Sequence, residues 1–203
     1  DMEQTIYTLL MNPKADVKAT ICHTSTENLD IIPANIDLSA AEVQLVNEVA
    51  RESALARVLR HVESDYDVVL IDCQPSLGLL AVNALTAAHG VIVPVEAEFF
   101  ALRGVALLVE TIETVRDRIN PRLKIDGIVA TMVDSRTLHS REVLQRLQEA
   151  FGDLVFDTRI GRTIKFPDAS VATEPIISYA PNHAGAHAYR RLAREVIARG
   201  DAA

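Results

Sequence analysis

The sequence predicts an α/β fold in which helices flank a mostly parallel β-sheet. Two observations support this. Short apolar runs rich in β-branched residues alternate with longer segments whose apolar residues recur at helical spacing. In addition, 49% of the 203 residues are apolar and only 4% are aromatic, so aliphatic side chains must fill the core. Short strands of this kind are typical of parallel sheets covered by helices. We expect residues 1–203 to form a single domain.

The run Asp67–Pro75 contains the strand that organises this prediction. Residues Val68 to Ile71 are apolar and lie between two aspartates, which indicates a strand buried on both faces. The strand should end near Cys73, because Pro75 cannot donate a ladder hydrogen bond. Asp72 is then at the carboxyl end of a central strand, where open α/β sheets bind ligands. Its carboxylate either holds magnesium beside a nucleotide phosphate or caps the next helix, and both interpretations stay open from this segment alone.

The other segments fit the same fold. Helices are expected where apolar residues recur every three or four positions, and strands where short apolar runs end at proline, glycine or polar residues. The helix that begins at Ser39 should start with a Ser39–Glu42 capping box and carry Val43, Val46, Val49 and Ala50 on one face. The expected helices cover 2–11, 39–50, 53–62, a stretch capped by Ser76 and ended by Gly90, 101–119, 140–150 and 184–198; the expected strands are 19–23, 29–33, 91–95, 125–133 and 154–160, and 161–181 is an expected loop.

The charge is unevenly distributed along the chain. The net charge is −8, but residues 1–100 carry 5 Lys and Arg against 15 Asp and Glu, whereas residues 101–203 carry 15 against 13. Any anionic partner should therefore contact the second half. The overall acidity argues against a protein that coats DNA indiscriminately. No apolar run is long enough to cross a bilayer.

Four stretches together resemble the ParA/Soj family of chromosome- and plasmid-partitioning ATPases, in the deviant Walker A group that includes MinD. They occur in the order found in that family and extend over nearly the whole chain, and a weaker match covers residues 29–35. The four stretches are 66–78 continued by 83–88, 94–104, 131–137, and the segment 160–181 with 185–189.

The resemblance also implies a gap. Family members begin with a strand and a glycine-rich phosphate loop that bears lysines, followed by a segment whose aspartate orients the attacking water. The 203 residues contain no glycine-rich run followed by Lys and Ser or Thr. We therefore expect a P-loop NTPase-like domain without its first strand and phosphate loop. Because phosphoryl transfer depends on positioning and charge stabilisation, such a chain should hydrolyse ATP poorly or not at all.

Site residues follow from the resemblance. Asp72 is implied to be the Walker B carboxylate that serves Mg²⁺ through water, and no catalytic residue is expected within these 203 residues. Asp134 matches a position that faces the adenine edge in relatives, and Gly161 begins a loop that lies over the base there. Arg136 and Lys165 match positions that contact DNA phosphates in relatives. Arg162 lies close to both groups, so it is a candidate for nucleotide and for DNA, and Arg141 or Arg159 are possible additions.

The implied function is an ATP-dependent partitioning switch. ATP and Mg²⁺ are the expected cofactors, and an ATP-dependent homodimer would bind DNA nonspecifically and release it when a ParB-like partner triggers hydrolysis. We expect a cytoplasmic, nucleoid-associated protein whose last helix docks on the sheet and forms no stable membrane anchor. Two alternatives stay open: a metabolic P-loop enzyme of the cobyrinic acid a,c-diamide synthase type, and a noncatalytic interaction module.

Overall fold

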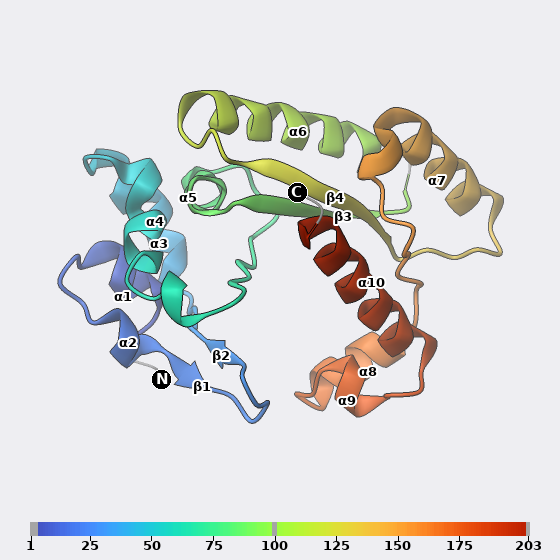
Figure 1. Cartoon of the computed structure of the whole chain (residues 1–203), viewed down its shortest axis with the longest axis horizontal. Helices are drawn as coiled ribbons and strands as arrows, with labels where there is room; N and C mark the ends of the chain where they lie inside the picture. Colours follow the sequence, from blue (N-terminus) through green and yellow to red (C-terminus); the bar gives the residue numbers. More distant parts are fainter. Residues whose placement is uncertain (1–3, 99–100, 202–203) are drawn as a thin grey trace. The chain divides into compact units, whose positions relative to one another are not determined.

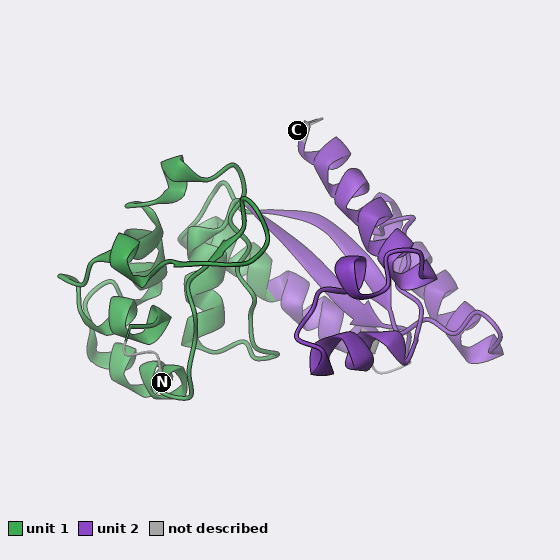
Figure 2. Ribbon diagram, turned by 90° about the horizontal axis from the view of Figure 1, so that it is seen from below, with its two compact units in different colours: residues 1–89, 111–123 green, residues 90–110, 124–203 purple. Residues whose placement is uncertain are grey.

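The computed structural model describes residues 4–98 and 101–201. Residues 1–3, at the start of the first expected helix, and residues 99–100, within the second resembling stretch, lie outside the described part. The chain forms two compact units, residues 1–89 with 111–123 and residues 90–110 with 124–203 (Figure 2). Helix α6 (Ala101–Arg118), which the sequence predicted, contributes residues to both units.

The first unit consists mainly of short helices around an aliphatic core (Figure 1). Its buried residues Leu10, Ala41, Leu45, Leu55 and Ala84 pack in one cluster. Each of the expected strands 19–23 and 29–33 contains a shorter strand, β1 and β2, and the two pair antiparallel; residues 19 and 20 belong to a short helix. Its elements are α1 (Ile6–Met11), α2 (Val17–Thr20), β1 (Cys22–His23), β2 (Asp30–Ile31), α3 (Leu38–Gln44), α4 (Ala54–Leu59) and α5 (Leu79–Ala87).

Helix α3 differs from the prediction in its start and in its buried face. Its N-cap residue is Asp37, so the expected Ser39–Glu42 capping box is wrong. Val43, Val46 and Val49, expected to share one apolar face of the helix, are 73%, 48% and 89% exposed. The helix ends at Gln44 and a 3₁₀ turn follows, so the helical period does not continue to Val49. Ala41 and Leu45, one turn apart, face the core instead.

The expected central strand is also wrong. No strand is assigned between Tyr66 and Gly78, and Val68 and Leu70 are 71% and 84% exposed. Only Ile71 of this run packs against the buried cluster. A strand exists only when neighbouring strands accept and donate its backbone hydrogen bonds, and among the described residues none does so here. The apolar run therefore has the sequence pattern of a strand, but no other described segment pairs with it to form a ladder.

The second unit contains the parallel sheet that the sequence predicted. Strands β3 (Gly90–Glu96) and β4 (Lys124–Thr131) pair in parallel, with a register shift between Val91 and Ile92. Residues 155–162 continue the parallel arrangement beside β4 through the bridges Ile128–Val155 and Val133–Gly161. The expected loop 161–181 is partly helical. The helices of this unit are α7 (Leu138–Phe151), α8 (Lys165–Val171), α9 (Ile176–Tyr179) and α10 (Ala184–Asp201).

Helix α10 covers one side of this sheet. Val129 of β4, Phe156 and Ile160 pack with Ala188 of α10, and Leu192 and Val196 extend the contact. In Figure 1, α7 lies on the other side of the strands from α10. Val143, Leu144 and Leu147 of α7 are buried, as their helical spacing predicted, although Thr137 rather than Ser140 is the N-cap. Among the described helices, none combines the length and apolarity needed to span a membrane.

Candidate functional site

The first candidate residue, Asp72, lies in the first unit, within residues 66–78, which form neither a helix nor a strand. It is exposed, and it contributes to no group of three His, Cys, Asp or Glu side chains among the described residues. An exposed single carboxylate nevertheless suits Mg²⁺, which usually keeps several waters and takes one or two carboxylates together with substrate phosphates. Asp72 is therefore compatible with a water-mediated metal contact, and its role there stays a prediction.

The second unit brings four other candidates together at the end of β4. Just beyond β4, the backbone N–H of Val133 donates to Ile160 O at 3.1 Å, and the N–H of Arg162 donates to Val133 O at 3.1 Å. This exchange places Gly161 and Arg162 beside Asp134 and Arg136. A cavity of about 360 Å³ opens here, lined by Val133, Asp134, Ser135, Arg136 and Arg162. The carboxyl ends of parallel strands meet at one edge, which explains why two segments far apart in sequence share a site.

Within this cavity, Asp134 is already engaged by Arg136. Oδ1 of Asp134 accepts from the backbone N–H of Arg136 at 3.1 Å and from Nε at 2.9 Å, and Oδ2 accepts from Nη2 at 2.7 Å. These bonds, with the charge of Arg162 nearby, lower the pKa of Asp134 from 3.8 to about 2. The residue expected to face a base and the residue expected to contact DNA are thus bound to each other.

This pairing predicts an unusual titration for Asp134. Because its pKa is depressed in the folded protein, the stabilisation from the pair is complete above the ordinary value of 3.8 and is lost as the pH falls toward about 2. Carbon-detected NMR of the side-chain carboxyl should show a midpoint near 2 in the wild type. In Arg136→Gln the midpoint should move up toward 3.8. An unchanged midpoint in that variant would mean that Arg136 is not the cause.

Lys165 lies apart from the cavity lining, at the first residue of α8. Its Nζ is 3.1 Å from Oδ2 of Asp168 and 6.0 Å from the ring centroid of Tyr179. The hydrogen bond to Asp168 raises the pKa of the lysine. Lys165 is therefore charged and half-exposed, but it must leave Asp168 to contact a phosphate fully.

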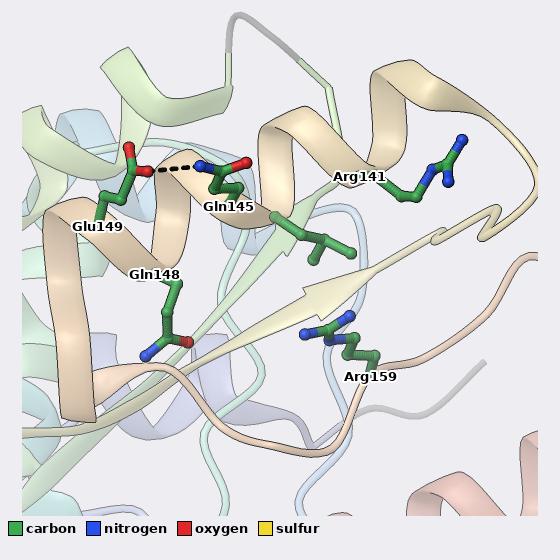
Figure 3. A pocket seen from close by; sticks show the side chains of 6 residues that line it. Arg141, Gln145, Gln148, Glu149 and Arg159 are labelled. Carbon is green, nitrogen blue, oxygen red and sulfur yellow. Dashed lines mark hydrogen bonds between the residues drawn. The ribbon is translucent and has the colours of Figure 1, made fainter.

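A second cavity, of about 330 Å³, lies between α7 and residue Arg159 (Figure 3). Arg141 and Arg159, possible additions to the DNA surface, both line it. Gln145 donates to Glu149 at 2.8 Å along α7. The lining has charges of both signs, because Glu149 lies in it with the two arginines. Sequence reasoning named the two arginines but could not place them in one cavity, because that depends on how α7 packs beside residues 157–160. Its lining is completed by Leu144 and Gln148.

Comparison with known proteins identifies the family. A family model described as an AAA domain matches residues 1–125. The sporulation initiation inhibitor protein Soj of Bacillus subtilis is 43% identical over 200 residues, which are 98% of this chain and 79% of Soj. The chain belongs to the ParA/Soj family. The fold prediction and the family resemblance are thereby confirmed.

Other matches show how much of each similar protein the chain covers. The uncharacterized protein Rv1708 of Mycobacterium tuberculosis is 57% identical over 199 residues, and the chain spans 63% of its length. The crystal structure of a cobyrinic acid a,c-diamide synthase from Mycobacterium smegmatis superposes with a TM-score of 0.79 at 38% identity, over 94% of this chain and 70% of that one. The same protein was solved with a bound ATP analog and magnesium (42% identity, TM-score 0.74, covering 80% and 64%).

Proposed function

We propose that the chain acts in chromosome or plasmid partitioning as the nucleotide- and DNA-binding part of a ParA-type switch. The observation that carries this proposal is the 45% identity, over 96% of the chain, to the chromosome-partitioning ATPase Soj of Treponema pallidum. ATP with Mg²⁺ is the proposed ligand, supported by the ATP analog and magnesium bound in the Mycobacterium smegmatis structure. In the proposed cycle, two copies of the chain form a dimer when ATP is bound, and a ParB-like partner triggers hydrolysis.

Asp72, Asp134, Gly161 and Arg162 are the proposed nucleotide-binding residues. The carboxylate of Asp72 would orient water molecules on the metal, and Mg²⁺ would supply charge neutralisation between phosphates. Arg162 reaches the cavity from the segment after Gly161 and offers a fixed positive charge there. Asp134 would accept from a donor on the base only after its bonds with Arg136 have been exchanged.

Arg136, Arg162 and Lys165 are the proposed DNA contacts. Lys and Arg that neutralise phosphates release counterions, so binding of this kind is independent of sequence and weakens steeply with salt. The side chain of Arg136 is 87% exposed, which leaves its outer face open to a phosphate even while it is paired.

Retention on duplex DNA tests the proposal. The protein should be retained on random-sequence duplex DNA at about 50 mM salt with ATP and Mg²⁺, and retention should fall by roughly tenfold or more at about 200 mM salt. ATP turnover by the 203 residues alone should stay near background, because they contain no phosphate-loop motif. Absence of DNA retention at low salt would contradict the partitioning role.

A second candidate function is favoured by the likeness to the cobyrinic acid a,c-diamide synthase of Mycobacterium smegmatis. An amidoligase of that type needs ammonia from glutamine, which calls for a catalytic Cys–His pair. The two cysteines, Cys22 and Cys73, have no hydrogen bond to a histidine among the described residues. A glutaminase assay separates the two functions: release of glutamate from glutamine would favour the amidoligase.

A further inference from the structure

One carboxylate in the first unit gathers three donors from a distant part of the chain. Oε2 of Glu42, on α3, accepts from the backbone N–H of Leu79 at 2.9 Å. Oε1 accepts from the N–H of Leu80 at 3.2 Å and from Nε2 of Gln74 at 3.0 Å. The partners are 32 to 38 residues from Glu42 in sequence. Glu42 therefore joins α3 both to the first turn of α5 and to the segment before it.

Gly78 lets the carboxyl group of Glu42 approach the backbone closely, because glycine has no Cβ atom. A Cβ atom at Gly78 would lie 2.6 to 2.9 Å from the carboxyl group of Glu42, closer than real side chains approach. The first N–H groups of α5 lack helical acceptors, and the positive end of the helix favours an anion. Glu42 supplies the acceptor that no cap side chain of α5 provides, since the N-cap residue is Gly78.

The segment that carries Asp72 has few other attachments. Within residues 67–78, the hydrogen bonds are local ones, such as Ser76 N to Gln74 O at 2.8 Å and Gly78 N to Ser76 Oγ at 3.1 Å. Among the described residues, the Gln74–Glu42 hydrogen bond alone joins this segment to a part of the chain outside α5. Asp72 thus lies between Ile71, which packs against the buried cluster, and Gln74, which is bound by Glu42.

We propose that Glu42 is a positioning residue for the metal–nucleotide site. It holds residues 74–80 in place, and this fixes the carboxyl end of the segment on which Asp72 is carried. The inference rests on the proposed function, in which Asp72 serves the metal. The contacts to Leu79 and Leu80 are sufficient to cap α5. The additional hydrogen bond to Gln74 fixes a residue two positions after Asp72, which capping does not require.

Hydrogen exchange tests the hold without any ligand. In Glu42→Gln, the amides of Leu79 and Leu80 should exchange roughly tenfold faster or more than in the wild type, because the anionic acceptor is lost. Glu48→Gln is the matched control: Glu48 is exposed and lies just after the 3₁₀ turn that follows α3, and its side chain makes no hydrogen bond or ion pair with the rest of the described chain. Equal exchange in Glu42→Gln and wild type would overturn the proposal.

Paramagnetic broadening tests the link to the metal. Mn²⁺ with ATP, titrated into labelled wild-type protein, should broaden the amide signals of Asp72 and Cys73. Glu42→Gln should need about tenfold more Mn²⁺–ATP for half-broadening, the lower end of what supporting groups of a metal site contribute. Gln74→Ala, which leaves the α5 cap intact, should need about threefold more, and Glu48→Gln the same amount as the wild type.

The outcomes separate the two proposals. If wild-type Asp72 and Cys73 are not broadened, the proposed nucleotide function fails and the role in metal positioning fails with it, while hydrogen exchange still reports whether Glu42 holds residues 79–80. If the wild type is broadened and both Glu42→Gln and Gln74→Ala respond like it, the nucleotide function stands and the positioning role of Glu42 is overturned.

Discussion

Replacing Arg199 by alanine should destabilise the second unit by about 3 kcal/mol, because one guanidinium on α10 holds three backbone carbonyls. Nη1 donates to the carbonyl oxygens of Asp126 and Leu154 at 3.1 and 3.2 Å, and Nη2 donates to that of Val155 at 3.0 Å. The guanidinium carbon also lies 4.1 Å from the ring centroid of Phe156, a cation–π contact. Removal of the guanidinium leaves partly buried backbone carbonyl groups without a hydrogen-bond donor.

Urea unfolding followed by circular dichroism measures this loss. Arg199→Lys should lie between alanine and the wild type, because an ammonium keeps the charge but cannot reach three carbonyls in a planar fork. Arg194→Ala is the control, since Arg194 is exposed on the same helix and its side chain has no hydrogen bond or ion pair within the described ranges. Equal midpoints for the Arg199 and Arg194 variants would show that the α10 contacts contribute little.

Replacing Arg136, Arg162 and Lys165 together by glutamine should weaken nonspecific DNA binding about a hundredfold at low salt. Each phosphate contact contributes about 0.9 to the slope of log affinity against log salt, so the slope should become shallower by about 3. Fluorescence anisotropy with a random-sequence duplex between about 50 and 200 mM salt gives both quantities. This prediction depends on all three side chains, which come from two segments that only the folded second unit brings near one another.

A charge-matched variant provides the control for that experiment. Glutamine at Arg118, Arg122 and Arg194 removes the same formal charge from exposed residues outside the proposed site. It should reduce affinity only a fewfold, through the general field of the protein. If the two triple variants lose affinity and salt slope equally, the effect is one of net charge and the assignment of Arg136, Arg162 and Lys165 fails.

The sequence alone predicted those elements whose pattern is local. Helices α6 and α7 and strands β3 and β4 were expected because their apolar residues follow a single period over many positions. The buried residues Val143, Leu144 and Leu147 followed from that period as well. The family resemblance, which rests on ordered stretches of sequence, also named Asp134, Arg136, Gly161 and Arg162 before any of them was placed.

The tertiary structure decided what depends on distant partners. The apolar run around Asp72 has the composition of a strand, yet it forms none, because a ladder needs neighbours from elsewhere in the chain. Glu42, expected to cap its own helix, instead accepts from residues 74–80, and Arg136 closes on Asp134 in the cavity beyond β4. A side chain forms hydrogen bonds with the groups that folding brings within about 3 Å of it. The spacing of apolar residues along the sequence does not indicate which groups these are.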